Sequence, residues 1–289
     1  MDSSSPAMAK ESTAFYRARQ TLVSSEAVKA EVAWSETAPR DRTCEIHSPV
    51  RQLLFPIGRG FAMRAGGREA VCDSNQVVLV PPGLVARDRL LGEEGPRAVI
   101  LSLGDAHLDE LLAAFGSRAE WSRVFERLTL PASPHVQQLA AVLNGGASAD
   151  PLLLEEATLD LVGAAFGVRE ALGADVGMRP RRLVDKVKEM LAQSSERLSL
   201  DAIGHALNAS PVYLTELFRR VEGMPIGRYQ RRLRLARALT LLPGATDITG
   251  LALDLGFSSH SHFATAFRAV HGMTPSAHRA RWQRVNRRG

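Results

Sequence analysis

The chain has 289 residues, of which 45% are hydrophobic and 23% charged, and its formal net charge at pH 7 is +5. No stretch approaches about 18 uninterrupted apolar residues, which excludes a membrane-spanning helix. The two cysteines, Cys44 and Cys72, are too few for a disulfide framework and lack the spacing of a metal motif. These features favour a reducing cytoplasm, where the cysteines serve as small hydrophobic side chains or one of them as a thiol sensor.

The charge is divided unevenly along the chain. Residues 1–179 hold 18 Lys and Arg against 23 Asp and Glu, whereas residues 180–289 hold 18 against 8. The net charges of the two parts are therefore -5 and +10. Such an asymmetry indicates a polyanionic partner for the second part alone.

The N-terminal part reads as a disordered segment followed by a β-rich region. Residues 1–25 are rich in Ser, Ala and charge, show no signal peptide and are expected to be partly disordered. Hydrophobicity then alternates with period two, and strands are predicted at 50–57, 59–65, 76–80 and 97–103. Gly66-Gly67 predicts a two-residue hairpin turn, and Pro81-Pro82-Gly83 ends the third strand. Short strands at this spacing predict a small barrel or a double-sheet jelly roll.

Residues 105–172 change to helical periodicity. Helices are predicted at 107–115, 134–143 and 151–172, the last with apolar positions on more than one side. Residues 173–180 are predicted to form a short linker to the basic part of the chain.

One pattern occurs twice in the basic part, about fifty residues apart. Each copy has a short amphipathic helix, a tight turn and a second amphipathic helix. The turn residue is Asn208 in the first copy and Gly256 in the second, and both residue types accept positive φ. Ser210 is the N-cap signal for the second helix of the first copy, and Ser258 or Ser259 for that of the second. Two copies in one register predict two helix-turn-helix units, whose second helices enter the DNA major groove.

Residues 225–242, between the copies, predict one continuous helix. Ile226, Tyr229 and Leu233 belong to its apolar stripe. Five arginines occupy the remaining surface: Arg228, Arg231, Arg232, Arg234 and Arg237. At 1.5 Å per residue the helix spans roughly 25 Å, close to the ~34 Å between successive major-groove faces of B-DNA. One rigid helix would thus set both reading helices on one side of a duplex, and the arginines either attract phosphate or form a solvated face.

A long motif extends from the end of this helix through the second copy. It comprises residues 238–242, Ile248, Leu251-Ala252, Leu255-Gly256-Phe257, Ser261-His262-Phe263, Phe267-Arg268 and Gly272-Met273-Thr274-Pro275. With it, residues 181–285 resemble the DNA-binding domain of the AraC/XylS family of bacterial transcription regulators. The resemblance implies seven helices, arranged as two helix-turn-helix subdomains joined by a linker helix.

The resemblance also implies which side chains face DNA. The base-reading positions fall on Val212, Thr215 and Glu216 in the first reading helix, and on His260, Ser261, His262 and Thr265 in the second. The positions for phosphate fall on Arg219, Arg220 and Arg268. His260 and His262 lie two residues apart on a helix and point about 200° apart, so we do not expect them to chelate one metal ion.

Two positions depart from the family pattern, because relatives often have arginine where this chain has Glu216 and Thr265. Arginine is the usual bidentate reader of guanine, so that contact is lost at both positions. Glu216 either accepts a hydrogen bond from cytosine N4, or is a surface charge that pairs with Arg219 or Arg220.

The β-rich region resembles, more weakly, the cupin-like sensor domain of many AraC/XylS members, in the run from Gly67 to Gly83. Metal-dependent cupins use two or three histidines and a carboxylate, but His47 is the only histidine before residue 107. We therefore expect no metal and no cofactor, and an interior that holds a small organic effector or is a packed core. In relatives the helices after the barrel form a dimer contact, and this is the role expected for residues 151–172.

The expected chain is α+β with two domains: a cupin-like β-barrel with following helices at 26–172, and the all-α DNA-binding domain at 181–285. The resemblance implies a sequence-specific transcription activator controlled by a small-molecule effector. Its implied partners are double-stranded DNA, RNA polymerase and a second copy, in the bacterial cytoplasm at the nucleoid. The alternative is a DNA-associated enzyme, such as a repair or cupin-type fusion protein. Repair proteins with this module need a zinc-held cysteine cluster that two isolated cysteines cannot form, so no enzyme activity is expected.

Overall fold

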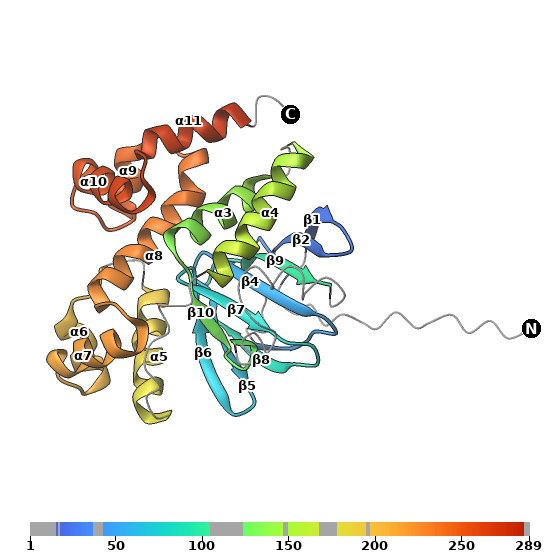
Figure 1. Cartoon of the computed structure of the whole chain (residues 1–289). Helices are drawn as coiled ribbons and strands as arrows, with labels where there is room; N and C mark the ends of the chain where they lie inside the picture. The colour runs from blue at the N-terminus through green and yellow to red at the C-terminus, as the bar shows by residue number, and fades with distance from the viewer. Residues whose placement is uncertain are drawn as a thin grey trace, which may run out of the picture.

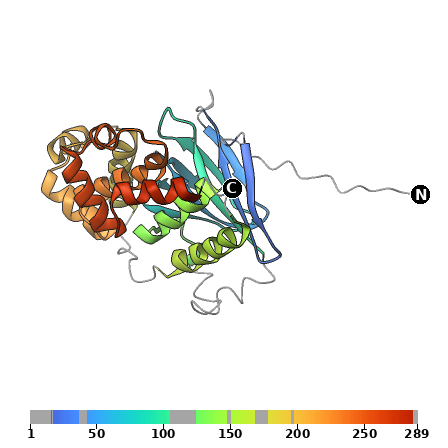
Figure 2. The ribbon, with the colours of Figure 1, turned by 90° about the horizontal axis from the view of Figure 1, so that it is seen from above.

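The computed structural model places two β-sheets beside a group of helices (Figure 1). It describes residues 16, 18–36, 43–104, 124–146, 150–167, 178–194 and 197–285. Figure 2 shows the same arrangement from above, with most of the C-terminal helices on one side and the sheets on the other. None of the described helices is both long and apolar enough to cross a membrane.

Ten described strands build the two sheets. They are β1 (Ala18–Ser24), β2 (Val28–Trp34), β3 (Thr43–His47), β4 (Arg51–Ile57), β5 (Phe61–Ala65), β6 (Arg68–Cys72), β7 (Gln76–Val80), β8 (Val85–Leu90), β9 (Arg97–Leu103) and β10 (Thr129–Pro131). The six-stranded sheet has the order β1-β2-β9-β4-β7-β10, and the four-stranded sheet has the order β3-β8-β5-β6. Within both sheets, the recorded neighbours pair antiparallel.

The sheets pack face to face, so the expected closed barrel is replaced among the described strands by an open sandwich. Phe61 and Met63 of the smaller sheet share one buried cluster with Leu54 and Ile100 of the larger sheet. No hydrogen-bonded strand pair joins the edges of the two sheets within the described residues. The period-two pattern predicts a sheet with one buried face, but it does not encode whether the edges close.

The predicted strands are largely confirmed. β7 and β9 have the predicted bounds, whereas β4 begins at Arg51 and β5 at Phe61. The predicted turn at Gly66-Gly67 joins β5 to β6, and both glycines have positive φ, 55° and 76°. β1 lies in the segment that was expected to be partly disordered. It is a strand because it forms an antiparallel hairpin with β2. The backbone N–H and the hydroxyl of Ser25 both donate to Val28 O in the hairpin turn.

Two helices cover the outer face of the larger sheet. They are α3 (Pro134–Gly145) and α4 (Pro151–Phe166), which begin at the N-caps Ser133 and Asp150. Their apolar side chains share one buried cluster with Leu53, Phe55 and Leu101 of the sheet. The prediction at 134–143 is confirmed, and that at 151–172 is confirmed as far as Phe166. The helix predicted at 107–115 lies outside the described residues.

The C-terminal part contains seven described helices, as the resemblance implies: α5 (Met178–Gln193), α6 (Leu200–Leu207), α7 (Pro211–Glu222), α8 (Ile226–Leu241), α9 (Ile248–Asp254), α10 (His260–His271) and α11 (Pro275–Val285). A short 3-10 helix (Leu242–Gly244) follows α8. One buried cluster joins α5, α6, α7 and the start of α8, and another joins the end of α8 to α9 and α10. Because α5 begins at Met178, residues 178–180 of the expected linker are helical. The division into domains stays a prediction.

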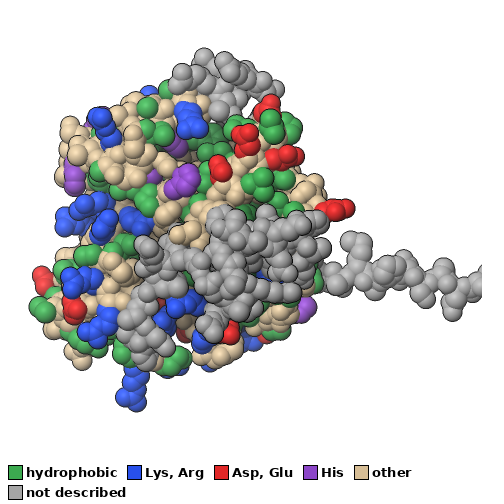
Figure 3. Space-filling model, viewed as in Figure 1, with side chains coloured by type: hydrophobic (Ala, Val, Ile, Leu, Met, Phe, Trp, Pro, Cys, Tyr) green, Lys and Arg blue, Asp and Glu red, His purple; other side chains and the backbone are tan. Residues whose placement is uncertain are grey.

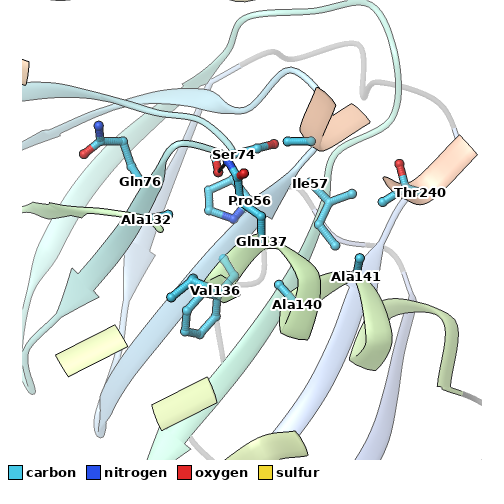
Figure 4. Close-up of a pocket in the computed structure, with 12 residues that line it drawn as sticks. Pro56, Ile57, Ser74, Gln76, Ala132, Val136, Gln137, Ala140, Ala141 and Thr240 are labelled. Carbon is cyan, nitrogen blue, oxygen red and sulfur yellow. Dashed lines mark hydrogen bonds between the residues drawn. The ribbon is translucent and has the colours of Figure 1, made fainter. Parts of the chain in front are cut away.

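The N-terminal part contacts α8 chiefly through α3. Ala141 of α3 belongs to the same buried cluster as Leu235 and Leu239 of α8. A hollow of about 20 Å³ lies at this contact, between β4, α3 and α8, and Figure 4 shows the residues that line it. That volume admits a water molecule and is too small for an organic effector.

Candidate nucleic-acid interface

The first helix-turn-helix unit, α6 and α7, is built by local sequence signals. Asn208 ends α6 with φ 49° and ψ 49°, the only positive φ of a non-glycine residue in the described part of the chain. The hydroxyl of Ser210 then accepts a hydrogen bond of 3.2 Å from Tyr213 N, and Pro211 occupies the first turn of α7. These features fix the angle at which α7, the first reading helix, leaves the turn.

The second unit, α9 and α10, uses the same devices with different residues. Gly256 makes the turn with φ 74°. Ser259 is the N-cap of α10 and accepts a hydrogen bond of 3.1 Å from His262 N, which decides between the two predicted caps. The hydroxyl of Ser258 instead lies 3.0 Å from Nδ1 of His262. The ring of His262 also packs edge-on to Phe257, with 5.5 Å between centroids. The side chain of His262 is thereby oriented before any ligand binds.

Each reading helix buries one face and leaves the other free. Leu214, Leu217 and Phe218 of α7 are buried, as are Phe263 and Phe267 of α10. Nine of the ten residues that the resemblance assigns to DNA are exposed: Val212, Glu216, Arg219, Arg220, His260, Ser261, His262, Thr265 and Arg268. The burial pattern is therefore compatible with DNA contact at these positions, although contact itself stays a prediction.

Thr215 differs from the other predicted readers because it is half-buried and its hydroxyl is engaged within the helix. That hydroxyl donates a hydrogen bond of 2.8 Å to Pro211 O. A threonine bonded in this way presents its methyl group rather than a free donor. The exposed Val212, four-fifths of whose surface is accessible, adds a second apolar group on α7. Apolar groups of this size suit contact with the methyl group of thymine.

Glu216 pairs with Arg219 one turn further along α7. Nη2 of Arg219 lies 3.5 Å from Oε2 of Glu216, and more than half of each side chain is exposed. Solvent screens such a pair, so it contributes little to stability. Glu216 thus makes the ion pair of the surface-charge alternative, and its contact with cytosine stays a prediction.

The arginines of α8 are divided between solvent and the protein interior. Arg228 and Arg231 are exposed, whereas Arg232, Arg234 and Arg237 are half-buried. Arg232 donates to the carbonyl of Ala132 in the N-terminal part. The solvated-face alternative does not describe these three side chains, because all three are half-buried. A helical stripe does not reveal that a second part of the chain covers the helix.

Arg234 stabilises the second unit from within. Its Nη1 donates a hydrogen bond of 2.6 Å to Gly256 O, and its guanidinium lies 4.8 Å from the ring centroid of Phe257. A basic side chain of the linker helix thus braces the turn that precedes α10. Figure 3 shows Lys and Arg side chains gathered on the helical side of this face of the molecule.

The contact between the two parts contains a buried polar cluster that sequence reasoning missed. The Tyr229 hydroxyl donates to the Asp73 carboxylate, and Asn75 Nδ2 donates a hydrogen bond of 3.2 Å to Tyr229 O. Gln76 Nε2 donates a hydrogen bond of 3.0 Å to a carboxylate oxygen of Glu222, whose other oxygen lies 3.2 Å from Lys188 Nζ. The sequence indicates only that residues 73–75 form a turn. It does not predict which residues they hydrogen-bond.

Burial and charge act in opposite directions on Lys188. Burial alone would lower the pKa of its ammonium group, but the carboxylates of Glu222, Asp73 and Asp185 raise it above its usual range. Burial also raises the pKa of Asp73. Lys188 therefore stays charged and holds α5 to α7, next to the contact with the N-terminal part.

The comparison with family models matches the helical part of the chain. Residues 203–281 match the family model of a helix-turn-helix domain. Over 86 residues the chain is 36% identical to the HTH-type transcriptional activator AarP of Providencia stuartii, which covers 29% of this chain and 64% of AarP. Over 96 residues it is 35% identical to the HTH-type transcriptional activator RhaR of Salmonella schwarzengrund, which covers 32% of this chain and 34% of RhaR. The chain thus matches less than two thirds of the length of each relative.

Solved structures are similar as well. A transcriptional regulator with an AraC-type DNA-binding domain from Chromobacterium violaceum is 34% identical, with 35% of this chain and 91% of that chain covered and a TM-score of 0.32. Wild-type ToxT from Vibrio cholerae with bound unsaturated fatty acid is 14% identical, with 88% and 95% covered and a TM-score of 0.37.

The sequence relatives are transcriptional activators and not enzymes. The match to the family model, at residues 203–281, falls on the two helix-turn-helix units, whose caps, turns and buried stripes are described above. Residues 203–281 thus form a helix-turn-helix domain similar to those of the transcriptional activators AarP and RhaR, as the resemblance to the AraC/XylS family implied.

Proposed function

We propose that the protein is a sequence-specific transcription activator that inserts α7 and α10 into two successive major grooves. The observation that carries this proposal is the pair of capped helices, each with a buried stripe and a free face, in the part of the chain with a net charge of +10. Two rigid reading helices joined by one linker helix specify both the base contacts and their spacing. The proposed location of this activity is the bacterial nucleoid.

The activator role rests on the relatives AarP and RhaR, which are activators by name. An activator of this kind recruits RNA polymerase, so the proposal includes a contact between the DNA-bound protein and polymerase. The N-terminal part is proposed to control that activity in response to a small-molecule effector. Its contacts with α8 support this role, because a change at the sheets reaches the helix that joins the two reading units.

A second copy of the chain is the proposed partner of α4. Leu152, Leu153 and Leu159 of this helix are exposed, with 64%, 40% and 51% of their surfaces accessible. Exposed leucines on one helix are typical of a helix-to-helix contact. Sedimentation of the full chain tests this part of the proposal: Leu152→Glu/Leu159→Glu should shift a dimer to a monomer. A wild-type protein that is monomeric at all concentrations would rule the dimer out.

Selection of genomic DNA fragments by the purified full chain tests the main proposal. We expect one sequence motif to be enriched, with affinity at least about 10³-fold above that for other fragments. The control is Arg219→Glu/Arg268→Glu, because both residues are exposed and their reversal should abolish binding without altering thermal unfolding. Wild-type protein that binds no DNA, or binds all fragments equally, contradicts the proposal.

A further inference from the structure

A second hollow lies where the β4–β5 turn meets the end of α5 and the middle of α8. Its volume is about 20 Å³, and its lining includes Arg59 from the turn, Ser194 after α5, and Gln230, Arg234 and Arg237 from α8. Unlike the hollow beside α3, whose lining has no charged side chain, this one is lined by three arginines from two parts of the chain.

Arg59 is held in place from the protein side. Its Nη1 donates hydrogen bonds of 3.1 Å to Ala192 O and 2.6 Å to Gln193 O, at the C-terminal end of α5. Its Nε donates to Glu94, 3.3 Å away, whose side chain is 63% exposed. Glu94 is therefore a weak, screened counter-ion, and the guanidinium of Arg59 is fixed at the rim of the hollow.

Arg234 and Arg237 leave donors unused. The Nε of Arg234 is buried and has no hydrogen-bond partner among the described residues. The guanidinium of Arg237 likewise makes no hydrogen bond within the described part of the chain, although it is half-buried. Burial, and then the neighbouring guanidinium of Arg59, lower the pKa of Arg237. Burial and the charges of Arg197 and Arg231 do the same for Arg234.

The hollow thus has three arginines in its lining, one exposed acidic partner in Glu94, and unused donors on Arg234 and Arg237. Among the acidic groups, Glu94 has the larger effect on the pKa of Arg237 and Asp73 the smaller one. Half-buried guanidinium groups repel one another unless an anion neutralises them, and planar N–H donors suit phosphate and carboxylate oxygens in particular.

We infer that this hollow binds an oxyanion, the phosphate or carboxylate group of a small molecule, between Arg59 and the α8 arginines Arg234 and Arg237. At about 20 Å³ the hollow has room for a water molecule, so the arginine side chains must move apart to admit the oxyanion, while the rest of the ligand lies toward solvent. The inference deepens the proposed function and rests on it, since the oxyanion belongs to the effector. A ligand that contacts the β4–β5 turn and α8 together favours the arrangement in which they touch.

Recessed arginines suit a small anion better than a DNA backbone. Arg228 and Arg231 of the same helix are exposed and available to phosphates of a duplex, whereas Arg237 faces the seam with the N-terminal part. We therefore do not infer that Arg237 contacts DNA, and the experiment below tests for that contact separately.

Isothermal titration of the full chain with inorganic phosphate and with malonate, at constant ionic strength, provides the test. We expect one anion per chain, with affinity reduced by at least about ten-fold in Arg237→Gln, because a charge-assisted hydrogen bond is lost. The matched control is Arg228→Gln, which removes the same charge from an exposed position of α8 and should change the affinity less than about two-fold. Arg237→Lys keeps the charge without the planar fork and should bind with intermediate affinity, which preserves the test if the glutamine variant fails to fold.

Equal affinity in wild type and Arg237→Gln, or no binding of either anion, would overturn the inference. So would a reduction by about 1 in the slope of log K for DNA against log salt in Arg237→Gln, since that would place this arginine on a DNA phosphate. A wild-type chain that binds no DNA but keeps the anion site would refute the proposed function and leave the oxyanion site standing.

Discussion

The hydroxyl of Tyr229 donates a hydrogen bond to the carboxylate of Asp73, at 2.8 Å from Oδ2 and 3.0 Å from Oδ1. This bond joins α8 to the turn between β6 and β7, and both side chains are buried. The edge of the Tyr229 ring also packs against Phe218 of α7, with 5.2 Å between centroids. One side chain of the linker helix thus contacts both the first helix-turn-helix unit and the N-terminal part.

Tyr229→Phe should lower the free energy of unfolding by about 1–3 kcal/mol, because it leaves the buried carboxylate of Asp73 without this donor. Urea denaturation of the full chain measures the change. Tyr213→Phe is the control, since Tyr213 is 51% exposed and its hydroxyl makes no hydrogen bond within the described residues. Equal stability of the two variants would mean that the Tyr229 bond adds nothing.

Asp88 gives the protein a pH-dependent stability. It lies on β8 opposite Met63 and points into the sandwich, where its Oδ1 has no partner among the described residues. Burial raises the pKa of its carboxyl group to about 8. Between about pH 4 and 8 the folded protein therefore holds a proton that the unfolded chain has lost, so raising the pH lowers the free energy of unfolding.

In the wild type this carboxyl lowers the free energy of unfolding by about 1.4 kcal/mol for each pH unit over that range. Asp88→Asn should remove this pH dependence. Denaturant midpoints of wild type and variant, compared from pH 5 to 8, measure it. Burial also raises the pKa of Asp185, to about 6, and this carboxyl adds to the slope in both proteins, so the difference between them is the decisive quantity. Glu45→Gln changes an exposed site on β3 and is the control. It should leave the slope of the free energy of unfolding against pH as it is in wild type. Parallel curves for wild type and Asp88→Asn would contradict the account.

Local signals in the sequence predicted the helical part well, because its caps and turns depend on residues close in the chain. Asn208, Gly256, Ser210 and Ser259 each act within a few residues of themselves. The helices of the two helix-turn-helix units, the linker helix α8 and the free faces of α7 and α10 follow from those signals and from the helical period, whereas the number of seven helices was implied by the family resemblance.

Contacts between distant segments could not be predicted in the same way. Arg232 bonds the carbonyl of Ala132, a hundred residues earlier in the chain, and the sequence of α8 does not predict this contact. The same holds for Tyr229, which the apolar stripe predicts to be buried but not to bond Asp73. The choice between a sandwich and a closed barrel likewise depends on which strand edges meet.

Arg219→Ala and Arg268→Ala should each weaken binding to all DNA sequences. The slope of log K against log salt should fall by about 1 in each, because one phosphate contact is lost. Fluorescence anisotropy at several salt concentrations measures the slope. Arg87→Ala is the control, because Arg87 is an exposed arginine of β8, outside the two helix-turn-helix units. Slopes that match wild type in both variants would show that these arginines do not meet the backbone.

Glu216→Ala should relax the preference at one base pair by roughly five-fold or more, since a direct base contact is worth about 1–3 kcal/mol. It also frees Arg219 from its 3.5 Å ion pair, so affinity for unrelated DNA should stay equal or rise. Glu216→Arg should move the preference toward guanine. Binding sites selected by the wild type, by both variants and by the exposed control Asp160→Ala provide the measurement. Identical sites for all four proteins would leave Glu216 as a surface charge.

Selection from random duplex DNA with the full chain, followed by the same selection with one variant in each reading helix, tests the central claim most directly. We predict a site with two conserved blocks whose centres lie about 10–10.5 base pairs apart, one helical turn. Glu216→Ala should alter positions in one block alone, and His262→Ala positions in the other alone. A site with a single block, or two variants that alter the same positions, would contradict the account in which α7 and α10 read successive major grooves.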